Sequence, residues 1–118
     1  MKEWQKVLVI SFLVTVPPVP ATAQHIVKEF DVPGPESRGL AWDGTYLWCA
    51  DAGEDSIFKI DPASGQVTHT IFFDLNPAYG GGITWSGDGA LWVTRVQYFY
   101  KLNANTGQQV TNFHCPGG

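Results

Sequence analysis

Nine residues of this sequence have the charge, polarity or aromatic face that ligand binding needs, and they lie in segments rich in turn-forming residues. They are Glu36, Arg38, Asp51, Glu54, Asp55, Tyr79, Arg95, Gln97 and Tyr98. Asp51, Glu54 and Asp55 form the densest group of carboxylates, and Ca²⁺ binds six or more such oxygens. Because no D-x-D-x-D-G loop surrounds them, we expect Asp51 to cap its own turn or to pair with Arg95. We therefore predict ligand-binding residues, with no metal ligands and no cofactor in this chain.

Residues for covalent or acid–base catalysis are not brought together by any motif. No Ser/His/Asp or Cys/His arrangement with recognisable spacing is present. His25, His69 and His114 are far apart, without the short separations typical of metal ligands, and we expect them at the surface. We predict no catalytic residue in this chain.

An internal repeat positions the candidate residues. Three motifs of the first copy return in the second: GLAWDG (39–44) as GITWSGDG (82–89), YLWCAD (46–51) as ALWVTR (90–95), and IFKIDPASGQV (57–67) as FYKLNANTGQQV (99–110). Trp42 and Trp85 are 43 positions apart, and Trp48 and Trp92 are 44 positions apart. A repeat of about 40–45 residues built from short strands is typical of a β-propeller blade.

Each copy contains four expected strands, which makes the chain all-β. Those of blade one are residues 39–42, 46–50, 56–60 and 67–75, and those of blade two are 82–85, 91–94, 99–102 and 109–115. Asp43-Gly44 and the DPASGQ segment supply turns, because glycine adopts positive φ at no steric cost. We predict two four-stranded antiparallel sheets, each forming one blade, with the candidate residues in loops at one end.

The segment at residues 25–32 (HIVKEFDV) matches the fourth strand of both copies. There are thus three copies of the outermost strand and two copies of the other three strands. This count predicts an extra N-terminal strand that lacks a partner within the chain. The expected organisation is a signal peptide (1–23), an N-terminal strand and loop (24–38), blade one (39–75) and blade two (76–118).

Tryptophan recurs at matching positions of the two copies, at Trp42, Trp48, Trp85 and Trp92. Propeller blades pack face to face, so large aromatic side chains fill the wedge between neighbouring sheets. A row of tryptophans is also what a sugar-stacking platform offers. Because the four recur at equivalent positions, we predict that they pack between sheets as core residues.

The first 23 residues have the layout of a secretory signal peptide. Lys2 and Lys6 precede an apolar run at 7–16, and Ala21 and Ala23 give an A-x-A ending. This run is too short to span a bilayer as a helix, which favours a cleaved signal over a membrane anchor. We expect a secreted or periplasmic protein that does not bind the membrane after cleavage.

Charge and cysteine content narrow the classes of partner. The net charge is −4, with only seven lysines and arginines, which argues against nucleic acid and anionic membranes as partners. Cys49 and Cys115 fall at positions where the other copy has Val93 and Leu75. We expect two buried thiols rather than a disulfide.

The pattern GLAWDG-x-YLW-x-AD followed by I-x-KIDP-x-SG-x-V (39–67) resembles blades of a large superfamily of six- to eight-bladed propellers. The group includes NHL repeats and SMP-30/gluconolactonase-like, streptogramin-lyase-like, glutamine-cyclotransferase-like and YncE-like proteins. The resemblance implies a propeller fold over residues 25–118 and leaves the activity open, since the shared motifs are structural. Lyases and lactonases of this superfamily use residues spread over many blades, so two blades would hold only part of such a site.

Two blades do not close a ring, which needs at least about four. Missing blades, self-association (three copies in a six-bladed ring, as in small two-blade lectins) or a protein partner would cover the open faces. The unpartnered strand at 25–32 favours the N-terminal part of a longer, incomplete propeller. We predict an exported repeat module that binds or scaffolds. The alternatives are a fragment of a propeller enzyme (lyase, lactonase or glutamine-cyclotransferase type) or a lectin-like chain that oligomerises. A complete propeller of this kind could hold Ca²⁺.

Overall fold

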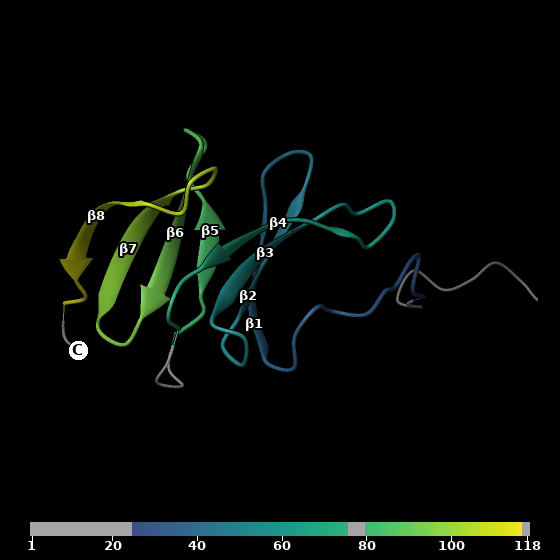
Figure 1. Cartoon of the computed structure of the whole chain (residues 1–118), viewed down its shortest axis with the longest axis horizontal. Coiled ribbons are helices and arrows are strands. Elements are labelled where there is room, and N and C mark those ends of the chain that lie inside the picture. Colours follow the sequence, from purple (N-terminus) through teal and green to yellow (C-terminus); the bar gives the residue numbers. More distant parts are fainter. Residues whose placement is uncertain (1–24, 76–79, 117–118) are drawn as a thin grey trace, which may run out of the picture.

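The computed structural model describes residues 25–75 and 80–116, which form two four-stranded antiparallel sheets (Figure 1). The strand orders are β1-β2-β3-β4 and β5-β6-β7-β8. The strands are β1 (Ser37–Trp42), β2 (Leu47–Asp51), β3 (Ser56–Ile60), β4 (Val67–Phe72), β5 (Ile83–Trp85), β6 (Ala90–Arg95), β7 (Tyr98–Asn103) and β8 (Gln109–His114). The predicted all-β class with two four-stranded sheets is confirmed. The predicted signal peptide (1–23) lies outside the described residues.

Matching turns close the outer hairpin of each sheet. Gly65, between β3 and β4, and Gly107, between β7 and β8, both have a φ of 77°. The Gly65 N–H donates to the Asp61 carbonyl at 2.7 Å, and the Gly107 N–H donates to the Asn103 carbonyl at 2.7 Å. Glycine adopts this left-handed conformation without strain. The sequence repeat is therefore also a repeat of backbone geometry.

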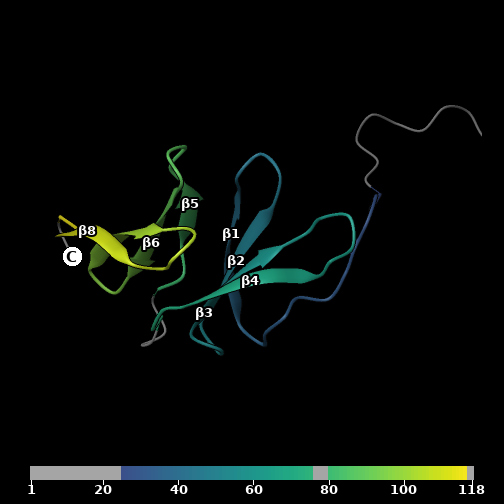
Figure 2. The same ribbon diagram turned by 45° about the horizontal axis from the view of Figure 1, so that its top comes forward.

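The two sheets pack on each other through an apolar layer, with β5 against β1 and β2 (Figure 2). Blade one contributes Ala41, Trp48, Ala50, Ile57 and Ile71, and blade two contributes Ile83, Trp85, Leu91, Val93, Tyr100 and Leu102. The rings of Trp48 and Trp85 stack across this layer, with centroids 6.5 Å apart. Burial of the layer holds the blades together, because either sheet alone would leave its apolar face in water.

A close backbone approach marks the junction of the two blades. A Cβ on Gly39, in β1, would lie 2.0 Å from the Gly81 carbonyl oxygen and 2.9 Å from Ile83 Cγ2. The carbonyl belongs to the backbone and cannot move aside cheaply. Glycine is therefore required where β1 meets the start of blade two.

The four recurrent tryptophans differ in how deeply their side chains are buried. Trp48 is 2% exposed and Trp85 is partly buried against it, as predicted. Trp42, by contrast, is 52% exposed, and Trp92 is only partly buried. The core prediction is wrong for Trp42 and Trp92, because the sheet faces that carry them have no second sheet packed on them among the described residues.

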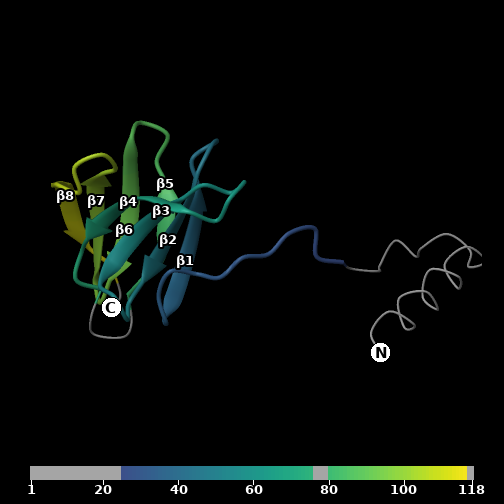
Figure 3. The same cartoon turned by 45° about the vertical axis from the view of Figure 1, so that its right-hand side comes forward.

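The segment at 25–32 forms no strand, so the prediction of an extra N-terminal strand is corrected. Its possible ladder partners, β3 and β7, are each paired on both edges, which leaves the segment without one. It is tethered at the turn after β3 instead, where Lys28 Nζ donates to the Ala63 carbonyl and Phe30 lies against Gly65. Figure 3 shows the segment leading away from the start of β1, outside both sheets.

Four candidate residues lie on strands rather than in the loops predicted for them. β1 begins two residues earlier than expected and includes Arg38, and β2 ends on Asp51. β6 ends on Arg95 and β7 begins with Tyr98. The ladders extend this far because Ser37 pairs with Asp51 and Arg95 pairs with Tyr98. The sheets themselves therefore set the directions of these side chains.

Both cysteines are free thiols, with Cys49 buried and Cys115 partly buried. Burial raises the pKa of the Cys49 thiol, the Ser37 hydroxyl opposes this rise, and the Asp51 charge adds to it. The Cys49 thiol is therefore protonated and unreactive at neutral pH. Within the described part of the chain, no helix has the length and apolar character needed to cross a membrane.

Candidate functional site

The turns that carry the candidate residues gather at one end of the two sheets, along the lower edge in Figure 1. The β2–β3 turn meets the segment before β1 there, through a hydrogen bond from the Ala52 N–H to the Glu36 carbonyl at 3.0 Å. The segment before β5 lies against the end of β6, where the Gly81 N–H donates to the Thr94 carbonyl at 2.9 Å. Loops of both blades thus meet at one end. Tyr79 lies outside the described residues.

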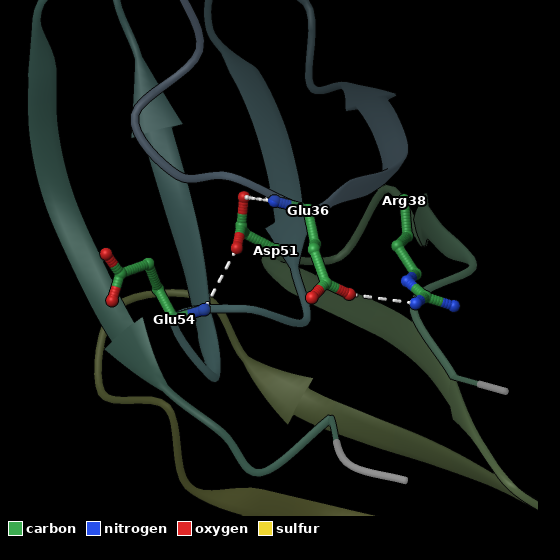
Figure 4. Close-up of polar contacts among 4 residues, drawn as sticks. All are labelled: Glu36, Arg38, Asp51 and Glu54. Atoms are coloured by element: carbon green, nitrogen blue, oxygen red, sulfur yellow. Dashed lines mark hydrogen bonds and ion pairs between the residues drawn. The ribbon is translucent and has the colours of Figure 1, made fainter. Parts of the chain in front are cut away.

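Asp51 is fully buried at this end, and both of its carboxylate oxygens accept hydrogen bonds (Figure 4). Oδ2 accepts from the Glu36 backbone N–H at 3.1 Å, and Oδ1 accepts from the Glu54 backbone N–H at 2.9 Å. A buried carboxylate needs such donors, because a charge left unpaired away from water is costly. Asp51 therefore caps its own turn, one of the two roles expected for it, and also binds the segment before β1 to that turn.

The acidic cluster organises turns and is closely packed. A Cβ on Gly34 would lie 2.4 Å from Asp51 Oδ2, so the loop before β1 rests directly on this carboxylate. Asp55 Oδ1 accepts from the Leu75 backbone N–H at 3.2 Å, while the Glu54 side chain is exposed. In residues 25–75 and 80–116, no group of three or more His, Cys, Asp or Glu side chains is arranged to hold a metal ion.

Two arginines carry the positive charge of this end, and each forms an ion pair. Arg38 Nη2 donates to Glu36 Oε2 at 2.9 Å, and Arg95 Nη2 donates to Asp74 Oδ2 at 3.1 Å. Both arginine side chains are 32% exposed, so water and salt screen the pairs, which contribute about 0–1 kcal/mol each. The two ion pairs place charges of both signs at this end of the sheets, which we call the rim.

The same two arginines flank the short Gly80-Gly81 segment before β5. A Cβ on Gly81 would lie 2.6 Å from Arg38 Cβ, and a Cβ on Gly80 would lie 3.0 Å from Arg95 Cα. Arg38 comes from blade one and Arg95 from blade two. The charged rim is therefore shared between the blades.

Gln97 and Tyr98 shape the blade-two side of this end. The Tyr98 ring packs edge-on against His114, with centroids 5.1 Å apart, and Gln97 Oε1 lies 3.3 Å from His114 Nε2. A shallow hollow of about 260 Å³ opens beside them, lined by Arg95, Val96, Tyr98 and Tyr100. Aromatic faces beside a guanidinium group suit a ligand that carries a ring or a planar polar group.

Two residues of this end are absent from the predicted candidates. Asp74 falls within a range predicted as strand, but β4 ends at Phe72. His114 is the last residue of β8 and was expected to be an ordinary surface histidine. Each follows or ends the fourth strand of its blade, and that position next to the loops is the signal that would have found them.

No protein-family model matches this sequence, and no curated protein matches it. Solved structures match it by fold. The glutaminyl cyclase of Myxococcus xanthus is 19% identical, with a TM-score of 0.55 over 66% of this chain and 32% of that chain. The hydrazine synthase of Kuenenia stuttgartiensis is 16% identical, with a TM-score of 0.55 over 80% of this chain and 27% of that chain. A luciferin-regenerating enzyme is 20% identical, with a TM-score of 0.53 over 69% of this chain and 30% of that chain.

These similarities show the fold alone, because the identities are low and this chain spans about a third or less of each protein. All three have propeller-type folds. Their agreement with the repeated turns and the sheet-on-sheet packing leads to one conclusion. The two sheets of this chain are neighbouring blades of a β-propeller, which the described residues form only in part.

Proposed function

We propose that this chain is an exported β-propeller repeat module that binds a ligand or scaffolds a partner, without catalysis. The binding region is the end surface, defined by the side chains of Glu36, Arg38, Glu54, Arg95, Gln97 and Tyr98. One observation carries the proposal. The repeat sets the frame, with the recurrent Trp48 and Trp85 packed between the blades, whereas the loops that meet at one end differ between the two copies.

Asp51 and Arg95 illustrate this division, since they occupy equivalent positions 44 residues apart. Asp51 is buried and organises the loops of blade one, while Arg95 is ion-paired at the rim of blade two. A rigid repeat that presents variable side chains at its loop end is the arrangement of many binding proteins. The rim supplies charge-assisted hydrogen bonds, and the hollow beside Tyr98 supplies an aromatic face.

A charge-reversal scan tests the binding proposal, with arrays of immobilised glycans and of short peptides as probes. We expect Arg38→Glu and Arg95→Glu to weaken binding to any retained probe by about tenfold or more, the effect of losing a charge-assisted hydrogen bond. Asn105→Lys is the matched control, because Asn105 is exposed in the β7–β8 turn at the other end. Binding that depends on residue 105 and not on the arginines would contradict the proposal.

A propeller enzyme is the second candidate, and the fold similarity to a glutaminyl cyclase favours a test of that reaction first. The probe is a peptide with an N-terminal glutamine, and mass spectrometry detects loss of ammonia. We expect no conversion above the uncatalysed rate. Conversion that disappears in Arg95→Glu would replace binding by catalysis.

Export is proposed from the layout of the first 23 residues. We expect cleavage after Ala23, so that secreted material begins with Gln24 or with pyroglutamate formed from it. N-terminal sequencing or intact mass checks this. Met1 retained in exported protein would exclude a cleaved signal.

A further inference from the structure

Each sheet has one face packed against the other sheet and one face, here called open, on which no second sheet lies among the described residues. On blade two, side chains from all four strands meet on the open face through direct cross-strand pairing. We name this the receiving face; it consists of Gly82, Thr84, Trp92, Thr94, Phe99 and Phe113. The same residues, together with Ile83, line an apolar hollow of about 390 Å³.

The receiving face repeats, position by position, the surface of blade one on which blade two is seated. Its residues correspond to Gly39, Ala41, Trp48, Ala50, Ile57 and Ile71, which lie 42 to 44 positions earlier. All of these except Gly39 belong to the buried core between the blades. On blade one the surface is covered by β5 and its neighbours, whereas on blade two no described residue covers it.

The open face of blade one repeats the other side of the same interface. We name this the inserting face; it consists of Leu40, Trp42, Leu47, Cys49, Phe58 and Ile60. Their equivalents, 42 to 44 positions later, are Ile83, Trp85, Leu91, Val93, Tyr100 and Leu102, through which blade two packs on blade one. Leu40 is 64% exposed and Trp42 is 52% exposed, whereas Leu47 and Phe58 are partly buried and Cys49 and Ile60 are buried within the chain. The exposed apolar surface of this face is therefore centred on Leu40 and Trp42, and neighbouring exposed apolar side chains of this kind mark an interaction surface.

The chain thus carries both halves of an interface of which it already contains one assembled example. We propose that copies of this chain associate head to tail, with the inserting face of one copy on the receiving face of the next. Trp42 of one copy then stacks on Trp92 of the next, as Trp85 stacks on Trp48 within the chain. This inference rests on the proposed propeller module and names a second copy of the chain as its partner.

Such a contact joins two different surfaces, so it closes into a ring when the rotation per copy fits. Propeller rings contain about four to eight blades, which corresponds to about two to four copies of this chain. Ring closure would cover every receiving face and every inserting face.

Two substitutions block the two sides separately. Trp42→Asp places a charge on the inserting face. Thr84→Arg places a long charged side chain on the receiving face, at the position whose equivalent, Ala41, is buried. Thr84 is exposed in the single chain, so this change leaves the blade intact. Leu40→Arg serves as a second inserting-face variant if Trp42→Asp lowers the melting temperature. Val27→Asp is the control, because Val27 is 91% exposed and lies outside both sheets.

Native mass is measured by light scattering during size-exclusion chromatography. We expect the mature chain and Val27→Asp to have about two to four times the chain mass, and each blocking variant to be a monomer. An equimolar mixture of Trp42→Asp and Thr84→Arg is expected to form a 1:1 dimer, since the first supplies an intact receiving face and the second an intact inserting face. A monomeric unmodified chain, or a mixture that stays monomeric, would overturn the proposal. A blocking variant that still dimerises alone would replace it by a symmetric contact.

The proposed function and this inference fail in different measurements. The glycan and peptide arrays report on the end surface, whereas native mass reports on the sheet faces. A monomeric chain whose binding depends on Arg38 and Arg95 would overturn only the head-to-tail contact. If the chain assembles but its binding does not depend on those arginines, only the binding role is overturned.

Discussion

The indole of Trp48 stacks on the indole of Trp85 across the two sheets, with ring centroids 6.5 Å apart and ring planes inclined by 13°. The polar edge of Trp48 is also satisfied, because its Nε1 donates to Asp43 Oδ2 at 2.8 Å. The stack joins one repeat to the next through positions that both repeats possess. It is the central contact of the interface between the blades.

Replacing Trp48 by alanine is expected to lower the free energy of unfolding by about 3–5 kcal/mol, because the side chain is 2% exposed. Trp92→Ala, at the equivalent position, is expected to cost roughly 1–2 kcal/mol, because Trp92 is only partly buried, against Phe113 and Lys101. Urea unfolding followed by circular dichroism, in the Thr84→Arg background, measures both losses. Equal losses would show that the two faces are equally covered.

Gly39→Ala tests the close approach of the blades. The added methyl group would meet the Gly81 carbonyl oxygen, so we expect a loss of about 1–3 kcal/mol from overpacking. Gly82→Ala is the matched comparison, since its methyl group would meet Thr94 Oγ1, a side-chain atom that can move aside at the cost of its hydrogen bond from the Gly82 N–H. A cost at residue 82 as large as that at residue 39 would place the tight junction elsewhere.

Asp51→Asn is expected to lower the free energy of unfolding by about 1–3 kcal/mol, because an amide donor replaces one of the two accepting oxygens. The backbone N–H of Glu36 or Glu54 then loses its partner, and hydrogen exchange at that amide should accelerate. Glu54→Gln alters an exposed side chain and should change stability by less than about 0.5 kcal/mol. Unchanged exchange at both amides in Asp51→Asn would show that the carboxylate does not hold the two loops together.

The lowered pKa of the Asp43 carboxyl predicts how the stability of the fold depends on pH. Burial alone would raise the pKa of Asp43, but hydrogen bonds from the Tyr46 and Thr45 N–H groups and from Trp48 Nε1, with the Lys59 charge, outweigh burial and lower it. A carboxylate whose pKa is lower in the folded state stabilises the fold above its unfolded pKa of about 3.9. That stabilisation is lost as the pH falls through the folded pKa.

Asp43→Asn should therefore lower stability at pH 7 and reduce the further loss of stability below about pH 4. Urea unfolding of both proteins across that range measures the difference. Parallel stability curves for the two proteins would exclude a contribution from Asp43.

The repeat, the turns and the two sheets follow from local sequence, and for that reason they could be predicted. Gly65 and Gly107 stand at the same place in matching turns and adopt the same φ, while the strands of each copy are short segments rich in apolar residues and bounded by turn residues. The ends of the strands were harder to predict from the sequence. β1 begins at Ser37 because it pairs with Asp51, and such a pairing depends on a second strand rather than on local composition.

The burial of the tryptophans depends on which surfaces meet, and this limits what one sequence can predict. Trp42 and Trp85 have equivalent positions, yet one is half exposed and the other is partly buried, because only Trp85 has a neighbouring blade. The role of Asp51 as the cap of its own turn was one of the two roles predicted from the sequence. Its second hydrogen bond, to the Glu36 N–H, joins segments 15 residues apart, and nothing in the local pattern indicates it.

The central claim is that the two sheets pack as neighbouring blades through the indoles of Trp48 and Trp85. Nuclear Overhauser contacts in the Thr84→Arg variant, where the chain is expected to be monomeric, test it most directly. We predict cross-peaks between the indole protons of Trp48 and Trp85, alongside the cross-strand contacts of Trp48 with Lys59 and of Trp92 with Lys101. If both cross-strand contacts are present and the indole cross-peaks are absent, each sheet is formed but the two do not pack as blades.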